Sequence, residues 1–304
     1  MHFLKKSTTD SVTTAIKYQN IFASAALIWL IPIPNVEAKD FNTYIIAATK
    51  QLAHERGGLG YSRISSFSND ISFGKNGFLS ARNPPYTMCV SAMLETIVVA
   101  LTLYAKDSGD YSPFHYLPKK SWERLTPVDL RGQIWIVKNS QSLGTAHALQ
   151  NFGMGTVEDF RNLKPGDFVN LNRNNRTGHA VVFLDYLDAK GEGLEIFSKE
   201  VAGFKYFSSQ GNESNGGYGY RYAFFSDAKC PILNGGRKRD CGIIRSNNSA
   251  LLHVGRMSHP SDWKKAQALE QLEREAFHMK NGDAEMLVEG DYNASFMSGK
   301  TTDD

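Results

Sequence analysis

Residues 89–101 read Cys-Val-Ser-Ala-Met-Leu-Glu-Thr-Ile-Val-Val-Ala-Leu, a long apolar segment that opens with a cysteine. Pro84 and Pro85 precede it and stop any earlier helix, so we expect a helix that begins at Cys89 and runs to Tyr104. The segment is apolar nearly all round, which is typical of a buried central helix. The remaining elements are therefore expected to pack around it.

Cys89 has two interpretations at this position. The unpaired N–H groups and the dipole at a helix start favour a thiolate and lower the pKa of a cysteine from about 8.5, which suits a nucleophile. A cysteine is also a small apolar residue that can simply fill a core. The apolar segment alone leaves both interpretations open.

Length and composition predict a globular chain with a sizeable core. Of 304 residues, 41% are hydrophobic and 21% are charged. The 34 basic and 31 acidic residues are spread along the chain and give a net charge of +3, so no nucleic-acid partner is expected. The sequence has neither a glycine-rich phosphate loop nor His and Cys at metal-ligand spacing, so we expect no cofactor and no metal.

Residues 1–38 have the pattern of a secretory signal peptide. Lysines precede an apolar run over residues 21–33, and small residues stand one and three positions before the bond that follows Ala38. We expect cleavage there and export of the chain to the periplasm or the exterior. The run is short and interrupted by proline, so stable membrane insertion is not expected, although an uncleaved anchor is the alternative.

Export to an oxidising compartment allows cysteines to pair. Cys230 and Cys241 flank a polar, glycine-containing segment and are expected to close a small disulfide ring. Cys89, the third cysteine, then stays outside the disulfide as either an inert buried thiol or a working one. This arithmetic favours a functional Cys89.

The second informative stretch predicts an antiparallel sheet. Pro165-Gly166-Asp167 forms a tight turn, residues 168–171 and 180–186 read as strands, and a further strand is expected over residues 203–210. His179 stands at the mouth of the central strand, where its imidazole can project into a cleft and act as a base.

Other polar and aromatic residues are weaker candidates. His147 lies among alanine and leucine on a predicted short helix and is interpreted as a partly buried structural histidine. Tyr61 and Asp70 are interpreted as ordinary loop residues. A glycine- and tyrosine-rich segment over residues 211–222 is expected to be a mobile loop that either binds a ligand or decorates a turn.

A cysteine at a helix start, followed by Pro165-Gly166-Asp167-Phe168-Val169 and by His179-Ala180-Val181-Val182-Phe183-Leu184, resembles the NlpC-type branch of the papain-like cysteine peptidases. The resemblance covers residues 40–225. It implies an α+β fold in which N-terminal helices, one carrying the nucleophile, pack on a central antiparallel sheet. The usual Asp-Cys-Ser-Gly of the family is replaced here by Met88-Cys89-Val90-Ser91.

The resemblance implies an exported cysteine hydrolase that cuts peptide or amide bonds in peptidoglycan stem peptides through a thioester acyl-enzyme, without a cofactor. Cys89 is the expected nucleophile and His179 the general base and acid. A third polar residue on the next strand orients the imidazole in that family. We favour Gln210 for this role, with Ser208 and Glu195 as alternatives.

Two other functions remain open. One is an amidase or acyltransferase that acts on another envelope substrate, and the other is a catalytically silent envelope-binding module. The expected partner is a peptidoglycan peptide, and the sequence identifies no inhibitor or immunity protein.

The expected domain organisation has four parts. A signal peptide over residues 1–38 precedes a papain-like catalytic domain over residues 39–228. A disulfide-closed extension follows over residues 229–257. A charged helix and a disordered tail are expected over residues 258–304.

Overall fold

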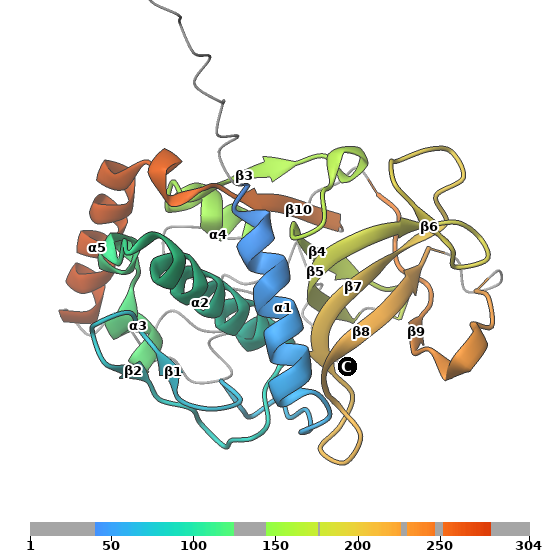
Figure 1. The fold of residues 1–304 in the computed structure, drawn as a ribbon, viewed down its shortest axis with the longest axis horizontal. Coiled ribbons are helices and arrows are strands. Elements are labelled where there is room, and N and C mark those ends of the chain that lie inside the picture. Colours follow the sequence, from blue (N-terminus) through green and yellow to red (C-terminus); the bar gives the residue numbers. More distant parts are fainter. Residues whose placement is uncertain (1–39, 125–143, 176, 226–229, 247–251, 281–304) are drawn as a thin grey trace, which may run out of the picture. The chain divides into compact units, whose positions relative to one another are not determined.

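The computed structural model describes residues 40–124, 144–175, 177–225, 230–246 and 252–280, and the predicted signal peptide and tail lie outside them. The chain separates into a short unit, Met1–Glu37, and a large one, Ala38–Asp304, which holds every described residue. The large unit is an α+β fold, as predicted (Figure 1).

The centre of the fold is an eight-stranded, mainly antiparallel sheet, which confirms the predicted hairpins. Among the strand pairs of the described residues, only β8–β9 is parallel. In spatial order the strands are β3 (Gly155–Glu158), β10 (Leu252–Met257), β4 (Phe168–Asn172), β5 (Gly178–Leu187), β7 (Gly203–Gln210), β8 (Gly217–Phe224) and β9 (Arg239–Asp240), with β6 (Gly193–Leu194) beside β5. A separate two-stranded sheet joins β1 (Ile71–Ser72) and β2 (Phe78–Leu79).

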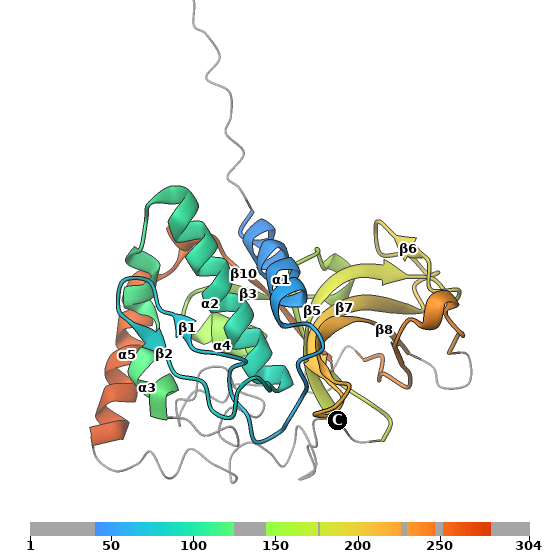
Figure 2. The ribbon, with the colours of Figure 1, turned by 60° about the horizontal axis from the view of Figure 1, so that its bottom comes forward.

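The helices gather beside this sheet, where Figures 1 and 2 show α1 and α2 side by side. The helices are α1 (Asn42–Arg56), α2 (Cys89–Ser108), α3 (Lys119–Arg124), α4 (Thr145–Asn151) and α5 (Lys265–Lys280). Helix α2 packs on β5 and β7, α1 on β8, and α4 on β3, β4 and β10. The predicted charged helix near the C-terminus is therefore confirmed as α5.

Helix α2 begins at Cys89, as the preceding prolines predicted, and ends at Ser108. The next residue, Gly109, caps it, because its left-handed φ of 76° lets its N–H reach the Ala105 carbonyl. By length and hydropathy this helix could cross a membrane, but 78% of its most apolar window is buried inside the protein. It is therefore the buried central helix of the fold.

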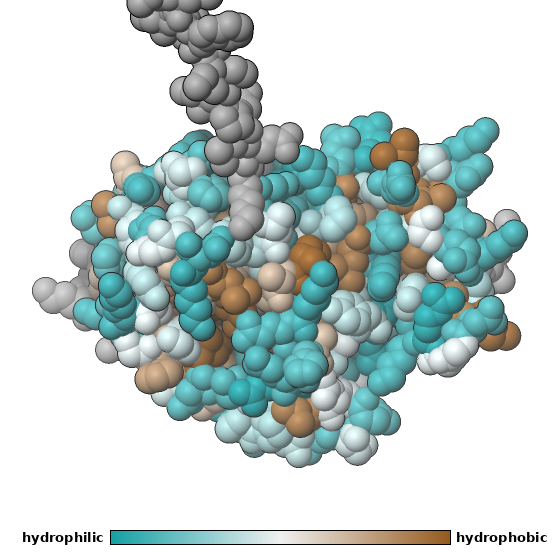
Figure 3. Space-filling view, in the orientation of Figure 1, coloured by the Kyte–Doolittle hydropathy of each residue, from teal (hydrophilic) through white to brown (hydrophobic). Residues whose placement is uncertain are grey.

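Alternate residues of the strands face two separate cores. Ala180, Val182 and Phe207 join a core with Cys89 and the helices, and we call this side of the sheet the helical face. Val181 and Tyr206 join the second core, which is covered by loop residues, and we call that side the loop face. Figure 3 shows separate hydrophobic areas within a mainly hydrophilic surface, as expected when both cores are enclosed.

The Pro-Gly-Asp turn joins the sheet to α1. Gly166 has a positive φ of 101°, and a Cβ there would meet the Asn42 side chain, so glycine is required. Asp167 is fully buried and accepts hydrogen bonds from Asn42 and from the Arg256 guanidinium at 2.6–2.8 Å. Asp167 thus forms a buried, structural ion pair with Arg256.

Two segments differ from the sequence prediction. Residues 229–257 were expected as an extension, but β10 inserts between β3 and β4, so their C-terminal part belongs to the main sheet. The second half of the expected mobile loop over residues 211–222 belongs to β8, because Tyr218 is buried and stacks on Phe207 at 5.4 Å. Side-chain packing across the strands outweighs the glycines there.

Candidate functional site

Cys89 is the first residue of α2 and is fully buried. The preceding residue, Met88, has an extended backbone, and its side chain makes no capping hydrogen bond to the N–H groups of the first turn. Cys89 takes no part in the disulfide. The structure therefore places a thiol at the positive end of a 20-residue helix.

The start of α2 lies against one end of the sheet. The Tyr218 hydroxyl, on β8, donates to the Glu95 carboxylate at 2.7 Å and also interacts with Thr87. Tyr218 pairs with Ser209 near the end of β7, next to Gln210. The helix start that bears Cys89 is thus near the sheet end at which β7 finishes and β5 begins.

Glu95 is a buried carboxyl that sequence reasoning did not identify. It accepts hydrogen bonds from the Ser68 N–H at 3.0 Å and the Ser68 hydroxyl at 2.6 Å, besides the one from Tyr218. Burial raises the pKa of Glu95, and these hydrogen bonds oppose the rise. The carboxyl ties α2 to the segment before it and to β8.

His179 is the second residue of β5 and is 3% exposed. Its ring packs on Tyr206 with the centroids 5.9 Å apart, on the loop face, whereas its neighbour Ala180 faces the core that contains Cys89. Neither ring nitrogen of His179 has a hydrogen-bond partner. The structure thus places Cys89 and His179 near the same end of the sheet but on opposite faces.

The electrostatic surroundings keep His179 neutral. Burial lowers its pKa well below 6.5, and the positive charges of Arg173 and Arg221 lower it further. The side chain of Gln210 opposes this lowering, which places its amide near the ring, although without normal hydrogen-bond geometry. A neutral imidazole is the form that accepts a proton, and the lowered pKa makes it a weak base in the free protein.

The structure brings Gln210 beside His179. Strand β7 pairs with β5 through Phe207 and Val182, and the same register continued along the strands sets Gln210 opposite His179. The Tyr206 hydroxyl donates to Gln210 Oε1 at 2.7 Å and fixes the amide.

The two alternatives for the third residue have other roles or positions. The Ser208 hydroxyl donates to the Ala180 carbonyl at 2.7 Å, so it joins β7 to β5. Glu195 is exposed, directly after β6. Gln210 is therefore the candidate whose side chain is directed to the imidazole.

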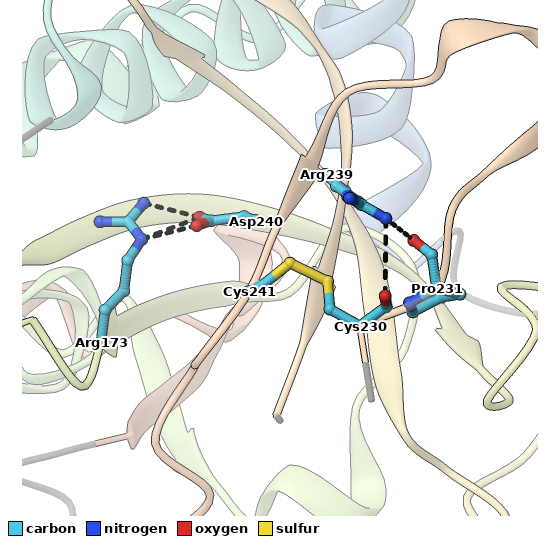
Figure 4. Close-up of a disulfide and its surroundings, with 6 residues drawn as sticks. All are labelled: Arg173, Cys230, Pro231, Arg239, Asp240 and Cys241. Atoms are coloured by element: carbon cyan, nitrogen blue, oxygen red, sulfur yellow. Dashed lines mark hydrogen bonds and ion pairs between the residues drawn. A yellow bond between two sulfur atoms is a disulfide. The ribbon is translucent and has the colours of Figure 1, made fainter. Parts of the chain in front are cut away.

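Behind Gln210 lies an ion pair that comes from two distant segments. Arg173, 4% exposed, donates from Nε and Nη2 to the Asp240 carboxylate at 2.7–2.9 Å (Figure 4). Asp240 Oδ2 also lies 3.3 Å from the Tyr206 hydroxyl. Asp240 directly precedes Cys241, which forms the predicted disulfide with Cys230. We call His179, Gln210, Tyr206, Asp240 and Arg173 the histidine network.

Sequence reasoning missed three members of this network, because Arg173, Tyr206 and Asp240 belong to separate segments without a shared motif. Only the disulfide prediction gave a signal, since it fixed the end of the segment that carries Asp240.

A pair of histidines lies on the helical face. The rings of His147 on α4 and His253 on β10 are 4.2 Å apart. His253 is 1% exposed without a hydrogen-bond partner at either ring nitrogen, and burial together with His147 lowers its pKa to about 3. His147 is partly buried, as its apolar neighbours predicted.

The two loop candidates have structural contacts. Tyr61 is buried and forms a β-bridge with Thr87, just before α2. Asp70 is exposed and accepts the Ala81 N–H at 2.8 Å, which closes the loop around β1 and β2.

Within the described ranges, no group of three or more His, Cys, Asp or Glu residues is placed to hold a metal ion. Comparison of the chain with protein-family models, curated proteins and solved structures finds no match.

Proposed function

We propose that this protein is an exported cysteine hydrolase that cleaves peptide or amide bonds in peptidoglycan stem peptides. The observation that carries the proposal is the position of Cys89 at the start of α2, near the sheet end where a neutral His179 lies beside Gln210. The proposal includes a papain-like, NlpC-type arrangement of helix and sheet. The Cys230–Cys241 disulfide supports export to an oxidising compartment.

The proposed reaction follows from these groups. The Cys89 thiol gives its proton to His179, and the resulting thiolate attacks the substrate carbonyl carbon. The N–H groups of the first turn of α2 stabilise the oxyanion. His179 then delivers the proton to the leaving amine, and water hydrolyses the thioester and regenerates the thiol.

The proposal makes two structural demands. The thiol of Cys89 is fully buried, so the start of α2 must open to admit substrate. His179 faces away from Cys89 in the free protein, so the first residues of β5 must reorient when substrate binds. His179 and Gly178 both pair with β4, so this movement must break ladder pairs at the start of β5.

A second candidate function is an envelope-binding module without catalysis. The opposite faces of Cys89 and His179, together with the complete burial of the thiol, favour it. An amidase or acyltransferase with the same nucleophile differs from the first proposal only in substrate.

The test incubates residues 39–304, as wild type and as Cys89→Ala, with purified peptidoglycan and identifies released fragments by mass spectrometry. We expect fragments from the wild type alone, with masses that identify the bond. His179→Ala should abolish release, whereas His147→Ala, the matched histidine control, should not.

Equal release by wild type and Cys89→Ala would refute the proposal. No release by either protein, with unchanged binding to the sacculus, would support the binding module.

A further inference from the structure

We propose that Asp240, held in place by the disulfide-closed segment Cys230–Cys241, is a positioning residue that acts through Tyr206 and Gln210 on the imidazole of His179. The inference deepens the proposed hydrolase function and rests on it for the kinetic consequence. Its structural part, that Asp240 sets the environment of His179, can be measured without any turnover.

A short strand and the adjacent disulfide hold Asp240 in place. Strand β9 has only two residues and pairs with β8 through Arg239 opposite Tyr222 and Asp240 opposite Ala223. So short a strand is weakly held by its own hydrogen bonds. The next residue, Cys241, is bonded to Cys230 with the two Cα atoms 5.9 Å apart, so the disulfide fixes the end of the strand (Figure 4).

Asp240 neutralises the positive charge of Arg173. The Arg173 guanidinium is nearly inaccessible and makes three hydrogen bonds to the Asp240 carboxylate. The positive charge of Arg173 also lowers the pKa of His179. A paired carboxylate offsets that charge, so loss of Asp240 leaves the imidazole facing a less compensated guanidinium.

Asp240 also contacts the Tyr206 hydroxyl, which orients Gln210. Tyr206 Oη lies 3.3 Å from Asp240 Oδ2 and 2.7 Å from Gln210 Oε1. The same tyrosine ring packs on the His179 ring. The hydroxyl has one proton, which the shorter distance gives to Gln210, so its contact with Asp240 is the weaker of the two. A displaced carboxylate removes that contact and loosens the tyrosine and, through it, the amide beside the imidazole.

Loss of the carboxylate charge and loss of the fixed amide act in the same direction. Arg173 then lowers the basicity of His179 more strongly, while Gln210, which supports the charged form, is no longer held in place. The imidazole becomes a weaker base and is less well oriented. In a hydrolase this affects kcat, whereas KM should change little, because the carboxylate does not touch substrate.

The variants are chosen to separate positioning from stability. Asp240→Asn removes the charge with little change in shape, and Tyr206→Phe removes only the hydroxyl. The Cys230→Ser/Cys241→Ser double variant removes the tether. Arg239→Ala is the matched control, because Arg239 donates to the carbonyls of Cys230 and Pro231 within the same segment.

The first readout is the nitrogen chemical shifts and pH titration of the His179 ring in ¹⁵N-labelled protein, assigned with His179→Gln. We expect Asp240→Asn and Tyr206→Phe to shift the His179 signals and lower its pKa, and the double serine variant to move them in the same direction. Arg239→Ala should leave them unchanged. Unchanged His179 signals in folded Asp240→Asn, or in folded Tyr206→Phe if the first variant does not fold, would overturn the inference.

The second readout is peptidoglycan hydrolysis by the same proteins. Asp240→Asn should lower kcat about tenfold and leave KM within about twofold. Shifted His179 signals with an unchanged kcat would overturn the kinetic part. If the variants shift the His179 signals but the wild type releases no fragments, the proposed function is refuted and the positioning role stands.

Discussion

The two faces of the sheet solve different problems near the same end of the fold. On the helical face, Cys89 sits in an apolar core at the start of α2, and the nearby polar contact joins Glu95 to Tyr218. On the loop face, His179 lies against a chain of polar and charged groups that leads to Arg173. The thiol is held by helix packing, whereas the imidazole packs on Tyr206, whose hydroxyl contacts Gln210 and Asp240.

This difference shows that strand alternation, rather than distance along the chain, decides which candidate residues meet. A shift of one residue in β5 would exchange His179 and Ala180 between the two faces. A site assembled from both faces therefore requires movement of β5, and a site on one face requires a different partner for the thiol.

The largest effect is expected on the helical face, from Glu95→Ala. The substitution leaves Ser68 and Tyr218 without their buried acceptor and opens a cavity, so the free energy of unfolding should fall by about 3–5 kcal/mol. Glu95→Gln keeps the shape and resembles the protonated acid, and should cost about 1–2 kcal/mol. Urea denaturation at pH 7 measures both.

The exposed Glu123→Ala is the control for Glu95→Ala and should change stability by less than about 0.5 kcal/mol. Equal stability of Glu95→Ala and wild type would show that the carboxyl does not fix the start of α2.

The next prediction concerns the loss of stability at low pH, to which a buried histidine on each face of the sheet contributes. His179 on the loop face and His253 on the helical face both have lowered pKa values when folded, the latter about 3. Above pH 6.5 both are neutral in the folded and unfolded chain. Below it the unfolded chain takes up protons that the folded chain refuses, so each histidine should cost about 1.4 kcal/mol per pH unit. Urea denaturation at pH 7, 5.5 and 4.5 follows this loss.

His253→Gln and His179→Gln should each flatten the acid loss of stability, while the exposed His115→Gln should not. Glu95 acts in the opposite direction, because its raised pKa costs stability as pH rises above about 4.5. An acid slope as steep in both histidine variants as in wild type would contradict the neutral, buried state of these rings.

A smaller effect concerns the thiol itself. Cys89 is fully buried, so iodoacetamide should react with it about a hundredfold more slowly in the native protein than in urea at the same pH. The reaction is followed by mass spectrometry, and the disulfide leaves Cys89 as the one alkylated cysteine. Equal rates in both states would show that the helix start opens freely. Native reaction that accelerates with a peptide substrate would support the proposed movement of β5.

The sequence predicted the elements better than their faces. Pro84 and Pro85 placed the start of α2, and the spacing of Cys230 and Cys241 predicted the disulfide. Strand β10 was missed, because its three apolar residues, Leu252, Val254 and Met257, do not alternate regularly and its partners are distant in the chain.

The candidate site was predicted in part for the same reason. The prediction that Gln210 lies beside His179 relied on their positions at adjacent ends of neighbouring strands. The face that His179 occupies depends instead on the pairing of β5 with β4, where His179 lies opposite Leu171. Arg173 and Asp240 meet only through folding and left no local signal. Local patterns therefore predict helix starts and turns, while register and long-range pairing decide the chemistry.

The smallest effect isolates the link between the loop-face network and stability. Tyr206→Phe removes one buried hydroxyl and leaves Gln210 Oε1 without its donor, so the free energy of unfolding should fall by about 1 kcal/mol. Tyr220→Phe, at an exposed position of β8, is the matched control and should change it by less than about 0.5 kcal/mol. A loss of several kcal/mol would make Tyr206 a main support of the loop-face core. A loss near 1 kcal/mol together with altered His179 signals would show that its hydroxyl serves the imidazole more than the fold.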